Sequence, residues 1–173
     1  MPFISIVESY SHLFGEEIIR QRFPDVAADI DGLEGLTIPP PTPSKEKTKV
    51  GKLVYRGENF NPPIAAHLTE LGWKKYPLPF RGEVDFKKGR VALEAQFGKY
   101  SFVAYDLNKF QDLFAVGESD GIDVGVEVIP SSSLAKKLYT GVANFTSEVS
   151  SIKSRGRSQP PMPIWIIGID IRE

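Results

Sequence analysis

Three polar residues in the middle of the chain have the types and spacing of a small metal-binding site: Asp85, Glu94 and Gln96. Glu94 and Gln96 are two residues apart in a segment whose apolar residues alternate, so both side chains fall on one face of a predicted β-strand. Asp85 precedes them in a similar segment, and a hairpin brings it within reach. Two carboxylates and an amide suit a hard cation such as Mg²⁺. Asp85 and Glu94 are therefore the candidate metal ligands.

The residues around this group predict a hairpin followed directly by a helix. Val84 and Phe86 alternate with acidic residues before a turn candidate at 87–89, and the alternation resumes over 91–97. From 99 to about 116, apolar residues recur at helical spacing. This order places the three polar residues at a sheet that a helix follows.

The other segments predict an α/β fold with a central mixed β-sheet flanked by helices. Four prolines between Ile38 and Ser44 predict an extended connector. We expect one domain over 1–173, with a helical N-terminal part and this connector over 1–44 and a catalytic core over 45–173. Further strands are expected over 122–129 and 163–171, and further helices over 7–18, 25–36, 61–71, 134–138 and 141–152.

Composition narrows the function classes. The chain has 173 residues, 41% of them hydrophobic and 25% charged, as in an ordinary globular protein. Its net charge of -1 gives no global basic signal, so a nucleic-acid partner must be held by local patches. The absence of cysteine excludes thiolate metal sites and cysteine nucleophiles. With no signal peptide and no membrane-spanning run, a cytoplasmic location is expected.

Spacing alone does not separate a metal site from three solvent-exposed polar residues on a hairpin. The order strand, turn, strand, helix favours the site, because it is the order of the PD-(D/E)xK nuclease motif, here with glutamine in the last place. Lysine and arginine residues also lie close by in the sequence. Acids that bind a metal beside bases that bind phosphate indicate phosphodiester hydrolysis.

Several segments resemble the BglII/BstYI-type restriction endonucleases. The run VDFKKGRVALEAQFGKYSF is the most specific, because its E-x-Q ending replaces the E-x-K of most PD-(D/E)xK nucleases. The segments KVGKLVY, GWKKYPLP, GVEVIP and PIWIIGI extend the resemblance over most of the chain from about Thr48 onward.

This resemblance implies a restriction-endonuclease-like core and a type II restriction endonuclease. Such an enzyme uses Mg²⁺ to hydrolyse phosphodiester bonds in double-stranded DNA at a short palindromic site, in this family often with a GATC core, and acts as a homodimer. In the family, the residues matching Asp85 and Glu94 hold magnesium, and the residue matching Gln96 helps to place the attacking water. The aromatic residues of the predicted 99–116 helix are expected to supply part of the dimer contact.

The other candidate catalytic and DNA-binding residues each have an alternative, purely structural interpretation. Glu70, on the predicted helix before the hairpin, is a further candidate catalytic carboxylate or a solvated helix glutamate. The serines at 131–133 are DNA contacts, as in the family's matching loop, or a helix cap. Two other functions stay open, a non-cleaving nucleic-acid-binding module on a nuclease fold and a structure-specific DNA nuclease. The candidate DNA-binding residues are Lys87, Lys88, Arg90, Lys99, Ser131, Ser132, Ser133, Lys153, Arg155 and Arg157.

Overall fold

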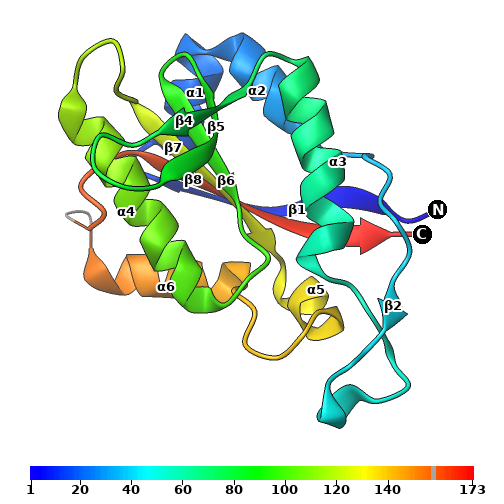
Figure 1. The fold of residues 1–173 in the computed structure, drawn as a ribbon. Coiled ribbons are helices and arrows are strands. Elements are labelled where there is room, and N and C mark those ends of the chain that lie inside the picture. The colour runs from blue at the N-terminus through cyan, green and yellow to red at the C-terminus, as the bar shows by residue number, and fades with distance from the viewer. Residues whose placement is uncertain (157–158) are drawn as a thin grey trace.

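The strand that carries Glu94 lies inside a six-stranded sheet with the order β1-β8-β7-β6-β5-β4 (Figure 1). This computed structural model describes residues 1–156 and 159–173. The three central strands run parallel to one another, and the outer strands are antiparallel to their neighbours, so the predicted mixed sheet is confirmed. The strands are β1 (Phe3–His12), β4 (Lys74–Pro77), β5 (Glu83–Lys88), β6 (Val91–Ala95), β7 (Val124–Pro130) and β8 (Ile164–Arg172).

Helices cover both faces of the sheet, which confirms the predicted fold class. On one face, α4 (Tyr100–Val116) and α6 (Phe145–Arg155) enclose an apolar core with Ala92 and Val84; we call it the α4 face. A second core with Leu93 fills the opposite face. The helices of that face are α1 (Gly15–Arg22), α2 (Pro24–Asp31), α3 (Gly57–Glu70) and α5 (Ser132–Lys137).

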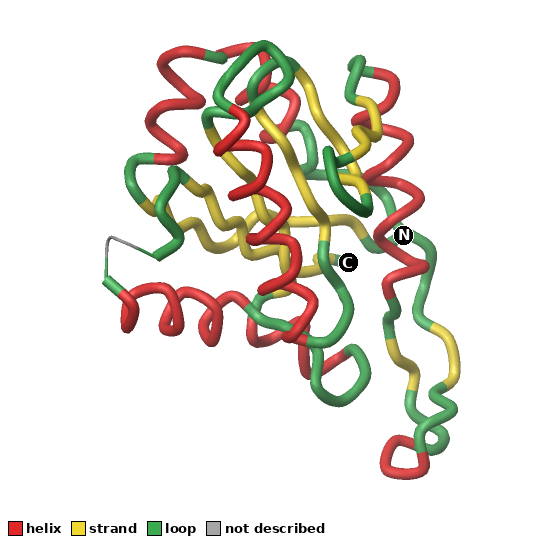
Figure 2. The backbone as a smooth tube through the Cα atoms, turned by 60° about the vertical axis from the view of Figure 1, so that its left-hand side comes forward, coloured by secondary structure: helices red, strands yellow, loops and turns green. Residues whose placement is uncertain are grey.

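The proline-rich connector leads into a narrow arm that extends away from the sheet (Figure 2). The arm consists of β2 (Thr42–Pro43), the 3₁₀ turn η1 (Lys47–Lys49) and β3 (Leu53–Val54), with β2 and β3 paired antiparallel. Its extended backbone agrees with the expectation from the prolines.

The prediction of a helix over 7–18 is wrong for its first part. Residues Phe3–His12 form β1, an edge strand that pairs antiparallel with β8, and the helix α1 begins only at Gly15. Apolar residues at positions 7, 10, 14 and 18 satisfy a helical period by coincidence. Pairing with β8 overrides it, because strand formation depends on the available partner more than on local propensity.

The other predicted helices and strands are present with shifted ends, whereas β2, η1, β3 and β4 were not predicted. The helix predicted over 61–71 begins four residues earlier, at Gly57, because the Arg56 amide and the Asn59 side chain form a capping box. The hairpin and α4 lie where they were expected. No helix of the described residues is long and apolar enough to cross a membrane.

Candidate active site

Asp85 lies at an irregularity of strand β5. Val84 packs in the α4-face core, whereas Phe86, two residues later, packs against the core of the opposite face. A regular strand would place both on the same face, and the pairing of β5 with β4 shifts register in the same stretch. This β-bulge turns the Asp85 amide toward Glu94, whose Oε1 accepts its hydrogen bond at 3.2 Å.

Glu94 is buried on β6, with only 2% of its side chain exposed. A solvent-exposed position is thereby excluded for this residue. The ammonium of Lys109, on α4, donates to Glu94 Oε1 at 2.9 Å and also contacts Asp106 Oδ1 at 3.1 Å. Glu94 therefore belongs to a buried polar group in the α4-face core.

The pKa of Glu94 is raised to about 9, mainly by burial. The Asp85 carboxyl and the negative charge of Asp106 contribute to this rise, and the hydrogen bond from Lys109 opposes it. The hydrogen bond from the Asp85 amide places Asp85 and Glu94 side by side, and their role as a pair of metal ligands stays a prediction. Such a carboxyl pair favours a bound cation in place of a shared proton.

A third carboxyl, that of Glu127 on β7, lies beside Glu94 in the sheet. The two residues are register partners on adjacent parallel strands. Glu127 is fully buried, and neither of its carboxylate oxygens forms a hydrogen bond with a described residue. Burial, followed by the charges of Asp106 and Glu94, raises the pKa of Glu127 well above its usual value.

The Gln96 amide is held on both sides. Its Nε2 donates to Asp106 Oδ2 at 2.7 Å, and its Oε1 accepts from the Gly98 amide at 2.9 Å. Asp106 thus contacts both Gln96 and Lys109, so the two residues of the E-x-Q motif are connected through α4.

Gly98 leaves no room for a side chain beside Gln96. A Cβ at this position would lie 2.6 Å from Gln96 Oε1 and 2.8 Å from Phe102 Cδ2. We expect Gly98→Ala to lower the cleavage rate by about 10- to 100-fold through displacement of the amide. Unfolding monitored by circular dichroism should lose only about 1 kcal/mol. A rate loss that matches the loss of folded protein would contradict this prediction.

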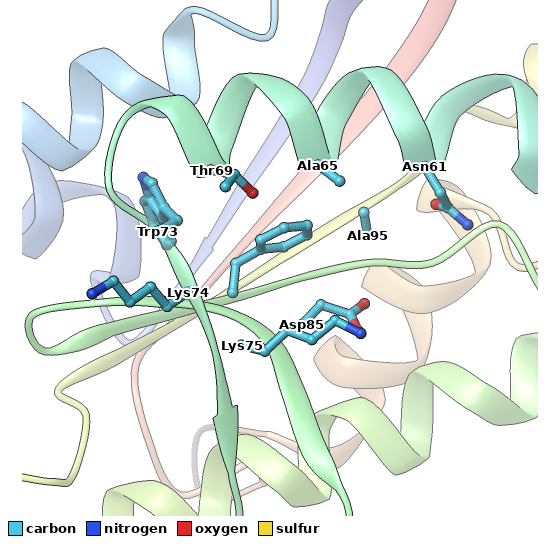
Figure 3. A pocket seen from close by; sticks show the side chains of 9 residues that line it. Asn61, Ala65, Thr69, Trp73, Lys74, Lys75, Asp85 and Ala95 are labelled. Carbon is cyan, nitrogen blue, oxygen red and sulfur yellow. The ribbon is translucent and has the colours of Figure 1, made fainter.

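Two cavities flank the end of β6. One, of about 480 Å³, lies between α3 and the β4–β5 edge and is lined by Asp85, Lys74 and Lys75 among others (Figure 3). The second, of about 530 Å³, is lined by Gln96 and Arg56 among others. Asn61 lines both cavities, so they adjoin along α3. Basic side chains therefore stand at both ends of a surface that passes the candidate site.

The donor set at Asp85 and Glu94 fits a hard divalent cation. Both groups offer carboxylate oxygens, and Asp85, whose amide bonds to Glu94, lines a cavity. Within residues 1–156 and 159–173, no three His, Cys, Asp or Glu side chains form a ready-made metal-binding group. Because Mg²⁺ takes about six oxygen ligands, water and a substrate phosphate would have to complete the shell.

The structure gives several of the predicted DNA-binding residues partners within the protein. Lys88 pairs with Asp29 at 2.6 Å and Arg90 with Asp123 at 2.9 Å, both near the turn of the hairpin. The Ser131 hydroxyl accepts the Leu134 amide, so the helix-cap alternative holds for this residue.

The other predicted contacts have looser surroundings. Lys87 lies over the Tyr76 ring, Ser132 bonds to Thr146, Lys153 lies over the Tyr10 ring and Arg155 bonds to Ser151. Lys99 and Ser133 are exposed. Arg157 lies outside the described residues. These assignments stay predictions.

Glu70 is exposed at the end of α3 and does not line the cavity at Asp85, although its neighbour Thr69 does. Several residues of the site were missed by sequence reasoning. Asp106 and Lys109 carried one usable signal, their i,i+3 spacing on a helix next to the motif. The missed residues are Arg56, Asn61, Lys74, Lys75, Asp106, Lys109 and Glu127.

Comparison with known proteins identifies a matching family and a similar solved structure. The family described as "Restriction endonuclease BglII/BglIII" matches residues 7–169. A solved structure, described as the crystal structure of restriction endonuclease BglII complexed with a DNA 16-mer, superposes with a TM-score of 0.77 at 18% sequence identity. The match covers 95% of this chain and 75% of that one. A search of curated proteins finds no match.

Proposed function

The chain belongs to the BglII/BglIII family of type II restriction endonucleases, which are site-specific endodeoxyribonucleases, and we propose that it cleaves double-stranded DNA with Mg²⁺ as cofactor. The observation that carries the proposal is the contact of Asp85 with Glu94 beside a cavity that Asp85 lines together with Lys74 and Lys75. The substrate is a short palindromic site, and a GATC core is the first sequence to examine. Such a substrate agrees with a cytoplasmic location.

In this mechanism Asp85 and Glu94 are the residues that would hold the cation. When bound, Mg²⁺ neutralises charge on the phosphate and acidifies a water molecule. Asp85 reaches the cavity because the bulge turns it away from both cores. Glu94 is fixed by two donors on Oε1, so a cation would have to be held through Oε2, which receives neither of them.

Gln96 orients the attacking water and takes no proton from it. An amide does not accept a proton near neutral pH, so Gln96 cannot act as a general base. Its Nε2 has a second hydrogen beyond the one that it donates to Asp106, and this hydrogen is available to a water molecule or phosphate oxygen.

We expect Gln96→Glu to lower the cleavage rate by roughly 100-fold, because the carboxylate would lose the donor to Asp106 and repel it. Quenched-flow cleavage of a duplex oligonucleotide measures the rate, and thermal unfolding measures the folded fraction. An unchanged rate in a fully folded variant would remove Gln96 from the mechanism.

The DNA-facing surface runs along α3 between the two cavities. Lys74 and Lys75 stand at one end and Arg56 at the other, on either side of Asp85 and Gln96. Their charges suit the phosphates on both sides of the scissile one, and their contribution should appear as a salt-dependent affinity.

A homodimer is proposed because one such site cuts one strand and a palindrome calls for matching half-sites. The predicted aromatic surface on α4 gives partial support. Phe110 is buried in the core, but Tyr100, Phe102 and Tyr105 are each at least half exposed. Light scattering at micromolar concentration, with and without DNA, tests the dimer.

Digestion of a plasmid of known sequence in the presence of Mg²⁺ tests the whole proposal. Discrete fragments with palindromic ends are the expected result. The two alternatives predict different outcomes: a non-cleaving binding module leaves the plasmid intact, and a structure-specific nuclease cuts only branched or single-stranded substrates. A sequencing gel of the fragments identifies the recognition sequence and the cut position.

A further inference from the structure

We propose that Lys109 is a positioning residue of the active site, which holds the Glu94 carboxylate and, through Asp106, the Gln96 amide in their working orientations. The inference rests on the proposed function. It adds a residue from helix α4 to a site that the E-x-Q motif alone places on one strand.

The contacts of Lys109 place it between the two residues of the motif. Its Nζ lies 2.9 Å from Glu94 Oε1 and 3.1 Å from Asp106 Oδ1. The other oxygen of Asp106 accepts from Gln96 Nε2 at 2.7 Å. A continuous chain of polar contacts therefore connects Glu94, Lys109, Asp106 and Gln96.

Lys109 supplies positive charge to a buried region that contains several carboxyl groups. Glu94, Asp106 and Glu127 bring three carboxyl groups into one buried region, and no other ion pair to Glu94 or Asp106 forms in the described part of the chain. The Lys109 ammonium reaches the Glu94 carboxylate from the neighbouring helix.

The Lys109 side chain is itself restrained. Only 11% of it is exposed, and its ammonium lies 4.9 Å from the centre of the Tyr105 ring. A restrained ammonium on Oε1 fixes the rotation of the Glu94 carboxylate and leaves Oε2 for the cation. Residues that orient a metal ligand in this way typically change metal affinity or activity by about 10- to 100-fold when they are replaced.

The test compares Lys109→Met, which keeps the aliphatic length, with Lys109→Arg, which keeps the charge. For Lys109→Met we expect kcat to fall by about 10- to 100-fold, with KM for duplex DNA unchanged within about twofold. The affinity of the DNA-free protein for Mn²⁺, measured by calorimetry, should fall about tenfold. Lys109→Arg should keep most of the wild-type kcat and of the Mn²⁺ affinity, because a guanidinium can bridge two carboxylates.

A second variant covers the case in which Lys109→Met does not fold. Asp106→Asn keeps the size of the side chain and leaves Lys109 paired with Glu94, so it should fold. Asp106 accepts from both Lys109 and Gln96, whereas asparagine presents one oxygen and one NH₂ group. One of the two contacts must break, and we expect kcat to fall about tenfold.

Arg20→Met is the matched control. Arg20 also joins two carboxylates, at 3.3 Å from Glu16 and 2.9 Å from Asp31, but on α1 at the opposite face of the sheet. Its kcat should equal that of the wild type. Wild-type kcat and Mn²⁺ affinity in both Lys109→Met and Asp106→Asn would overturn the inference, and the proposed function would stand. Failure of the wild type to cut any duplex DNA would instead overturn the proposed function.

Discussion

Glu94→Gln and Asp85→Asn are each expected to lower the cleavage rate by at least about 1000-fold. Each removes one of the two converging carboxylates while keeping its size. A metal-bound transition state for phosphoryl transfer is stabilised by several kcal/mol, and each 1.4 kcal/mol corresponds to about tenfold in rate. Alanine is the poorer choice at Glu94, because it would remove the buried Glu94 side chain altogether and leave Lys109 paired with Asp106 alone.

DNA binding should survive these changes. Asp85→Asn removes negative charge next to a phosphate, and Glu94→Gln replaces a carboxyl that carries a proton at neutral pH in the metal-free protein because its pKa is raised to about 9. Affinity for duplex DNA should therefore be equal or higher. Single-turnover cleavage with Mg²⁺ gives the rate, and fluorescence anisotropy without divalent cations gives the affinity. Cleavage at the wild-type rate by either variant would contradict the assignment of Asp85 and Glu94 as metal ligands.

Metal dependence should be complete and should vary with pH. Chelation of divalent cations is expected to abolish cleavage, and addition of Mg²⁺ to restore it. In the metal-free protein the pKa of Glu94 is about 9, because of burial, the Asp85 carboxyl and the Asp106 charge. At neutral pH a cation must therefore displace a proton. The affinity of the protein for the divalent cation should therefore rise about tenfold per pH unit between about pH 6 and pH 8.

As the pH rises, the unfolding free energy of the metal-free protein should fall, whereas its affinity for the cation rises. The raised pKa means that the folded protein binds a proton at Glu94 that the unfolded chain releases above its usual pKa of 4.5. This contribution to the unfolding free energy is fully present below about pH 4.5, and it is lost as the pH rises toward about 9. Glu127, whose pKa is also raised, adds in the same direction.

Calorimetry of Mn²⁺ binding in buffers of different ionisation enthalpy counts the released protons. We expect about one proton per cation at neutral pH. Glu94→Gln is the control, since it has no proton to release at this position. A Mn²⁺ affinity that is constant from about pH 6 to pH 8 would contradict the prediction.

The hairpin and the helix that follows it could be predicted because their signals are local. The alternation around Glu94 and the glycine turn at Gly89 specify a hairpin without help from the rest of the chain. Strand β1 could not be predicted, because its partner β8 lies more than 150 residues away in the sequence, as the pairing of Phe3 with Arg172 shows. Its apolar residues also match a helical period.

The inner part of the candidate site was not predicted for a similar reason. The alternation of Val124, Val126 and Val128 places Glu127 on the other face of its strand, where a glutamate normally meets water. Helix α4 covers that face instead and brings Asp106 and Lys109 onto it. The rotation of a helix over a sheet follows from the packing of its whole apolar surface, which a linear pattern does not contain.

Because Val84 faces one core and Phe86 the other, the acid of β5 cannot drift along its strand during evolution. An aspartate moved to position 84 or 86 would enter an apolar interior, and a deletion before the bulge would invert the strand. Alignments of distant relatives should therefore anchor on the bulge and on E-x-Q together, even where the length of the hairpin turn differs.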